Sequence, residues 1–173
     1  SGIKPIIGCE VYVAPRTRFD KDPDRDRNMN HLVLLAENMT GYKNLTKIVS
    51  AAFTEGFYFK PRVDKELMRE HSEGIICLSA CLAGAIPRKI LNGDYSGAKA
   101  EALELRDIFG KDNFYLEIQN HFLDDDKPAT QGLVKLSEEI GAPLVATNDA
   151  HYIKRSDAKA HDVLLAIQTG STV

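Results

Sequence analysis

The 173-residue chain has no tryptophan, only three cysteines, no long apolar run and no excess of positive charge. A helix that crosses a bilayer needs about 18 or more apolar residues in succession, so we expect no membrane association. A secretory signal, which is a basic segment followed by an apolar one, is also missing. The odd cysteine count (Cys9, Cys77 and Cys81) argues against a disulfide framework and predicts a reducing compartment.

The charge balance excludes one class of partner binding. The formal net charge is −3, which argues against a domain that grips nucleic acid through bulk positive charge. The densest charged run, residues 16–27, mixes both signs around Pro23, so it is predicted to be a solvated, mobile loop. Hydrophobic residues make up 43% of the chain and charged residues 27%, which is typical of a globular fold.

Short apolar runs alternate with amphipathic segments along the chain. The apolar runs predict strands at 6–13, 31–36, 74–79, 114–118 and 143–147, with an extended segment at 57–62. Helices are predicted from Thr40 to Gly56, from Asp64 to Met68, from the third strand to Gly93, and over 97–109, 132–140 and 157–167. This alternation predicts an α/β fold with mainly parallel strands, as an open sheet or a barrel.

Polar side chains follow or begin several of the predicted strands. In parallel α/β folds, functional groups gather just beyond the carboxyl ends of the strands. Burying such groups without partners would cost several kcal/mol, whereas a metal cluster makes their burial favourable. Imidazole, thiolate and carboxylate donors suit zinc, with manganese or iron as alternatives. The candidates at the strand ends are Glu10, His31, Cys81, Glu117, His121, Asp149 and His151.

Several long blocks together resemble a known family. The blocks IKPIIGCEVYVAP, HLVLLAENMTGYKNL, GFYFKPRVD, SEGIICLSACLAGAIP, FYLEIQNH and LVATNDAHYI resemble the PHP (polymerase and histidinol phosphatase) domain of the bacterial DNA polymerase III α subunits. The resemblance covers essentially the whole chain. It implies a distorted seven-stranded β/α barrel with outer helices and a cluster of metals held by nine ligands. It implies that Glu10, His31, Cys81, Asp149 and His151 are the metal ligands in this chain.

The resemblance also implies roles for residues around the ligands. Glu117, His121 and Asn148 are expected in the pocket wall or behind the ligands. The residues Tyr58, Lys60 and Arg62 are expected to form a rim that meets phosphate or strand ends, and ordinary solvated loop positions are an equally good explanation for them.

One departure from the family pattern concerns the start of the chain. The family's domain opens with a His-x-His strand and two further ligands, whereas this chain begins at Ser1-Gly2-Ile3-Lys4-Pro5. We therefore expect residues 1–173 to be a partial PHP domain whose end leads toward the polymerase palm. An incomplete barrel of this kind is expected to lack robust catalysis and to self-associate through exposed edges.

Two functions remain open at this point, both in the bacterial cytoplasm. In the intact parent, a DNA-directed DNA polymerase, the domain would be a metal-dependent phosphoesterase with 3′–5′ exonuclease proofreading activity on DNA. Alternatively, it would be a structural module that braces the polymerase and docks a separate proofreading exonuclease subunit, with the metals as staples. A stand-alone amidohydrolase-like or phosphatase fragment is a remote third alternative.

Overall fold

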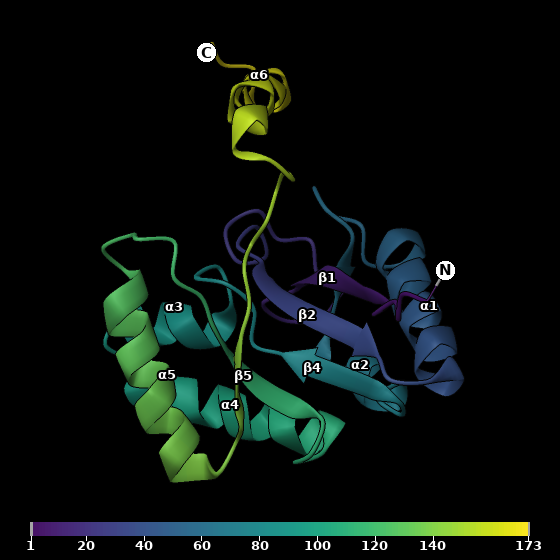
Figure 1. Cartoon of the computed structure of the whole chain (residues 1–173). Coiled ribbons are helices and arrows are strands. Elements are labelled where there is room, and N and C mark those ends of the chain that lie inside the picture. Colours follow the sequence, from purple (N-terminus) through teal and green to yellow (C-terminus); the bar gives the residue numbers. More distant parts are fainter. Residues whose placement is uncertain (1, 173) are drawn as a thin grey trace.

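The computed structural model describes residues 2–172, so Ser1 and Val173, the ends of the expected 1–173 domain, lie outside the described residues. Strands and helices alternate through most of this range (Figure 1). The strands are β1 (Gly8–Val13), β2 (Asn30–Ala36), β3 (Arg62–Val63), β4 (Ile75–Leu78), β5 (Phe114–Ile118) and β6 (Leu144–Ala146). The helices are α1 (Met39–Thr54), α2 (Lys65–Glu70), α3 (Ala85–Leu91), α4 (Tyr95–Phe109), α5 (Asp126–Ile140), the 3-10 turn η1 (Arg155–Asp157) and α6 (Ala158–Thr169).

The six strands of the described residues form one open sheet in the order β3-β1-β2-β4-β5-β6. Strand β2 runs antiparallel to its neighbours β1 and β4, and the pairs β1–β3, β4–β5 and β5–β6 are parallel. The sheet ends at β3 and β6 without closing on itself. The expectation of an incomplete α/β barrel with mainly parallel strands is confirmed.

One face of the sheet carries the hydrophobic core. Alternate strand residues point to this face, where α1, α4 and α5 pack against them. The fully buried core includes Leu34, Ile48, Phe114, Leu116 and Leu136. Each such side chain contributes about 1.5–3 kcal/mol when it is buried. The other face carries the alternate positions, Glu10 and His31 among them, and these stay partly or largely exposed.

Helix boundaries follow capping chemistry more closely than the apolar pattern. Helix α1 begins after Asn38, whose side chain accepts a hydrogen bond from the Gly41 N–H, so the prediction of Thr40 as its cap was wrong. Asp64 caps α2 as predicted. Helix α5 begins at Asp126, six residues before the predicted start, because Pro128 falls in the first turn, where a missing N–H costs nothing.

The charged run 16–27 is a loop with mostly exposed residues, as predicted, but ion pairs hold it in a defined arrangement. Arg16 forms a bidentate ion pair with Asp26, at 2.9 and 2.6 Å, and Asp26 is fully buried. Arg18 bonds Asp64 and Glu55 across the loop. Acidic and basic residues of this mixed-sign run thus serve as ion-pair partners.

The last helix stands apart from the rest of the fold. Figure 1 shows α6 beyond the body, at the end of the extended segment that follows β6. Within the described residues it has no buried side chain, and Val163, Leu164 and Ile167 are exposed. Neither α6 nor any other helix in residues 2–172 is long and apolar enough to cross a membrane.

Candidate metal centre

Three of the five predicted ligands meet at one edge of the sheet. Glu10 lies in β1, His31 near the start of β2, and Cys81 just past the end of β4. Because β2 runs opposite to the other strands, its first residues lie at the same edge as the carboxyl ends of its neighbours. The antiparallel register pairs His31 with Tyr12, two residues after Glu10, so Glu10 and His31 share a face.

The donor atoms of these three residues form a compact group. His31 Nδ1 lies 2.5 Å from Glu10 Oε1 and 3.7 Å from Cys81 Sγ. All three donor atoms lie within 4.8 Å of one another. Imidazole nitrogen, thiol sulfur and carboxylate oxygen are together the donor set that zinc prefers, so these residues fit a metal ion.

Unusual backbone conformations occur beside the site residues. Outside glycine, the described chain has positive φ only at Phe59 (60°), Ala80 (66°) and Phe122 (63°). Ala80 precedes Cys81, Phe122 follows His121, and Phe59 lies between Tyr58 and Lys60. Left-handed backbone is unfavourable for residues with a Cβ and tends to be retained at functional sites. At Ala80 it turns the chain at the end of β4, where Cys81 joins the group.

The electrostatics of the group favour a cation. Burial raises the pKa of the Cys81 thiol, and the negative charges of Asp149 and Glu10 raise it further, although a backbone N–H of Ala83 lowers it. The thiol therefore sits among acidic groups that disfavour a second negative charge. A cation in the same place would reverse this effect, because it would attract all of these groups.

Asp149 and His151 are not part of this tight cluster. The Asp149 N–H donates to His121 Nε2 at 3.3 Å, and His151 Nδ1 lies 2.9 Å from the Asp149 carbonyl oxygen. Both side chains are exposed. The ring of His151 packs against that of His161, with the two ring centroids 5.6 Å apart. The prediction that all five residues share one site stays a prediction, since the structure brings three of their donor atoms together and not those of Asp149 and His151.

Glu117 is buried behind the group. Its Oε1 accepts hydrogen bonds from Gln119 Nε2 (3.1 Å) and from the Thr147 hydroxyl, while its Oε2 has no protein partner. Its backbone N–H donates to the Ser79 hydroxyl at 2.8 Å. Glu117 thereby ties together the ends of β4, β5 and β6, which lead to Cys81, His121 and Asp149.

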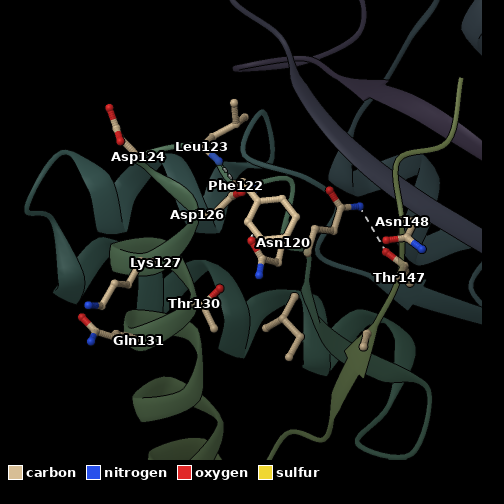
Figure 2. A pocket seen from close by; sticks show the side chains of 13 residues that line it. Asn120, Phe122, Leu123, Asp124, Asp126, Lys127, Thr130, Gln131, Thr147 and Asn148 are labelled. Atoms are coloured by element: carbon tan, nitrogen blue, oxygen red, sulfur yellow. Dashed lines mark hydrogen bonds between the residues drawn. The ribbon is translucent and has the colours of Figure 1, made fainter. Parts of the chain in front are cut away.

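A groove of about 760 Å³ opens beside these strand ends. Figure 2 shows Phe122 between Asp126 on one side and Thr147 and Asn148 on the other. Asp126 anchors this loop, because its Oδ2 accepts the backbone N–H groups of His121 and Leu123. The pKa of Asp126 is lowered chiefly by the Leu123 N–H. Asn148 lines the groove, whereas His121 and Glu117 do not, and the assignment of these three residues to a pocket wall stays a prediction.

The expected phosphate rim is only partly exposed. Lys60 is exposed and Tyr58 is half-buried. Arg62 is fully buried, and its guanidinium donates to the backbone carbonyls of Gly56, Arg18 and Asp20 at 2.8–3.0 Å. The prediction of Arg62 as a rim residue was therefore wrong, because its side chain is buried and donates to backbone carbonyls of the loop 16–27 and of Gly56.

Comparison with known proteins agrees with this geometry. The family model described as PHP domain matches residues 1–121. The chain belongs to the PHP domain family.

Curated relatives of this PHP chain extend the similarity to its last residues. The DNA polymerase III subunit alpha of Treponema pallidum is 49% identical over 97% of this chain and 14% of the relative. Those of Borreliella burgdorferi and Thermus aquaticus are 49% and 48% identical over 99% of this chain, and 15% and 14% of the relatives. The PHP chain thus spans about one seventh of the length of these relatives.

Sequence reasoning missed some contacts of the PHP site. Tyr12 packs edge-on against the His31 ring, at 5.2 Å between centroids. Its position two residues after Glu10 in a strand was a usable signal, since alternate residues share a face. The hydrogen bonds of Ser79 and Thr147 to Glu117 had no signal of this kind, because they join strands that are far apart in the sequence.

Proposed function

We propose that Glu10, His31 and Cys81 hold a zinc ion, and that in the whole polymerase subunit this site belongs to a metal-dependent phosphoesterase that removes nucleotides from DNA 3′ ends. One observation carries the proposal, namely three zinc-type donor atoms within 4.8 Å of one another at the edge of the sheet. Asp149 and His151 are proposed as further ligands, and Asp149 already acts on the Cys81 thiol through its charge. The relatives named DNA polymerase III subunit alpha support DNA as the substrate class, and we propose the bacterial cytoplasm as the setting.

Each residue of the chain has a distinct part in this proposal. A divalent ion bound here would supply Lewis-acid activation of water and of a phosphoryl oxygen. Glu10 would supply a carboxylate oxygen and His31 an imidazole nitrogen to the same ion, from Oε1 and Nδ1 atoms that lie 2.5 Å apart. Glu117 fixes the strand ends that carry the remaining groups. Lys60, at the exposed rim, neutralises charge on a phosphodiester substrate.

Zinc binding is tested with a matched pair of cysteine variants. Cys81→Ser is expected to lose stoichiometric zinc, measured by metal analysis after dialysis, and to lose the thiolate-to-cobalt charge-transfer absorption when cobalt replaces zinc. Cys9→Ser is the control, because Cys9 neighbours Glu10 but points to the opposite face of β1. Retention of zinc by Cys81→Ser would exclude this centre.

Catalysis is tested in an intact α subunit that carries these residues, loaded with zinc, on a primer with a mismatched 3′ end. We expect Asp149→Asn to abolish metal-dependent removal of the terminal nucleotide without loss of the fold. For the present chain alone we expect little hydrolysis. An intact, zinc-loaded subunit without exonuclease activity, in which Asp149→Asn changes only stability, would refute the enzymatic proposal.

The open sheet favours a second candidate function, a structural module that docks other polymerase subunits such as a proofreading exonuclease. The edge strand β6 is paired on one side only, and α6 exposes apolar side chains. In this case a chelator lowers the melting temperature and no hydrolysis accompanies the metal. Self-association through the same edges is expected, and a monodisperse monomer in light scattering would contradict it.

A further inference from the structure

Close to the candidate metal centre lies a set of aromatic and basic side chains that we call the aromatic platform: Tyr12, Arg27, Tyr58, Phe59 and Lys60. We propose that this platform binds the unpaired end of a single-stranded nucleic acid by base stacking and phosphate contacts. The stacking requires no metal. That the bound strand leads to the metal centre rests on the proposed phosphoesterase function.

The turn that carries Phe59 does not contribute to the hydrophobic core. The Tyr58 N–H donates to the Lys60 carbonyl at 3.0 Å, which places Phe59 at the tip of a tight turn. Phe59 has a φ of 60°, a conformation that glycine or asparagine adopts more readily, and its side chain is 59% exposed. A large apolar ring held outward in an unfavourable conformation indicates a binding role.

The buried Arg62 supports the Tyr58 ring of the platform. The guanidinium of the buried Arg62 lies 5.1 Å from the centre of the Tyr58 ring, and the Tyr58 and Phe59 rings lie 4.5 Å apart. Because four backbone carbonyls hold the Arg62 guanidinium, the Tyr58 ring that packs on it has a fixed support. A preorganised aromatic surface of this kind loses little freedom when it binds a ligand.

The cations of the platform alternate with its rings. Arg27 Cζ lies 5.8 Å from the Phe59 ring centre, and Lys60 Nζ lies 5.8 Å from the Tyr12 ring centre. Single-stranded nucleic acids present the matching alternation of bases with π-faces and phosphates with negative charge. Since the chain as a whole has a net charge of −3, binding depends on these local groups and not on bulk charge.

The platform is continuous with the metal group. The Tyr12 ring, under the Lys60 ammonium, packs edge-on against His31 at 5.2 Å. A strand whose base stacks on Phe59 and whose phosphate meets Lys60 therefore has its next linkage directed toward Glu10, His31 and Cys81. This placement requires an unpaired strand, because bases within a duplex are not free to stack on a side chain.

The test is fluorescence anisotropy of a labelled oligothymidylate with this chain, in the presence of EDTA. Phe59→Leu is expected to weaken binding about tenfold or more, because it removes the π-face and keeps an apolar side chain. Phe59→Asn, which suits the turn, is expected to do the same. Phe53→Leu is the matched control on α1, since Phe53 is also 59% exposed, and is expected to bind like wild type. Lys60→Gln is expected to reduce the salt dependence by about one phosphate contact.

Several outcomes overturn the platform: unchanged binding by both Phe59 variants, an equal loss in Phe53→Leu, or competition by a blunt duplex as strong as that by single strands. The proposed enzymatic function fails separately. If the zinc-loaded intact subunit hydrolyses no phosphodiester but Phe59-dependent binding persists in EDTA, the phosphoesterase is refuted and the platform stands. If hydrolysis of bis(4-nitrophenyl) phosphate is present while Phe59→Leu binds normally, the platform is refuted.

Discussion

Replacing Arg62 with methionine tests whether a buried guanidinium holds the loop 16–27 in place. Methionine keeps much of the volume and removes every donor. Four carbonyl oxygens, of Gly56, Arg18, Asp20 and Asp26, then lose bonds of 2.8–3.4 Å. Hydrogen bonds from charged donors contribute about 1.5–3 kcal/mol each. Burying the guanidinium away from water costs several kcal/mol, and this cost offsets part of the free energy that its hydrogen bonds contribute to stability.

The balance predicts a net loss of about 3–5 kcal/mol, as found when other buried charged networks lose one member. At this chain length, 1 kcal/mol corresponds to about 2–4 °C in melting temperature, so Arg62→Met is expected to melt about 10 °C lower. Circular dichroism with heat and urea measures both quantities. Arg62→Lys is expected to lose less, because one ammonium reaches only some of the carbonyls.

The control is Arg69→Met on α2, whose side chain is half-exposed and lies 3.9 Å from Glu104. Exposed pairs of this kind contribute about 0–1 kcal/mol, so its melting temperature should scarcely move. If Arg62→Met also melted within about 2 °C of wild type, the loop would not depend on the guanidinium, and the buried contacts would have been misjudged.

Three further predictions concern pH, packing and metal. The hydrogen bond from Arg16 lowers the pKa of Asp26. The ionised carboxylate therefore stabilises the fold fully above about pH 4, and this stabilisation is lost as the pH falls further. In urea titrations, Asp26→Asn should make the free energy of unfolding depend less on pH in this range. A Cβ on Gly41 would lie 1.7 Å from the Gly74 carbonyl oxygen, so Gly41→Ala should destabilise by about 2 kcal/mol or more in thermal melts. Zinc at 100-fold its dissociation constant should stabilise by about 2.7 kcal/mol, and chelation or Cys81→Ser should remove this gain in calorimetry.

Local patterns predicted the strands well, and they pointed to three residues whose donor atoms the structure brings together. The apolar runs located β2, β4 and β5, and the search beyond strand ends found Cys81. These signals are short-range, because burial and strand alternation depend on neighbouring residues. The closeness of Glu10 to His31 followed only when the register of β1 and β2 was known.

The errors arose where partners come from distant parts of the chain. Arg62 looked like an exposed rim residue because its acceptors belong to residues 18–20 and to Gly56, and a backbone carbonyl leaves no mark in a sequence. Asp26 looked solvated for the same reason, since its partner Arg16 lies across a loop. The left-handed turn at Ala80 had no signal either, since alanine is not a residue that marks such turns.

The shortness of β6 divides the candidate site into two parts of different local stability. Glu10 and His31 lie in strands that pair with neighbours on both sides, and Cys81 follows a third strand of that kind. The segment with Asp149 and His151 continues from an edge strand of three residues, which is held by β5 alone and is largely exposed. Local unfolding begins in such weakly held segments. Opening of β6 would therefore withdraw Asp149 and His151 while the other three residues keep their arrangement, and amide hydrogen exchange would be fastest on this side of the sheet.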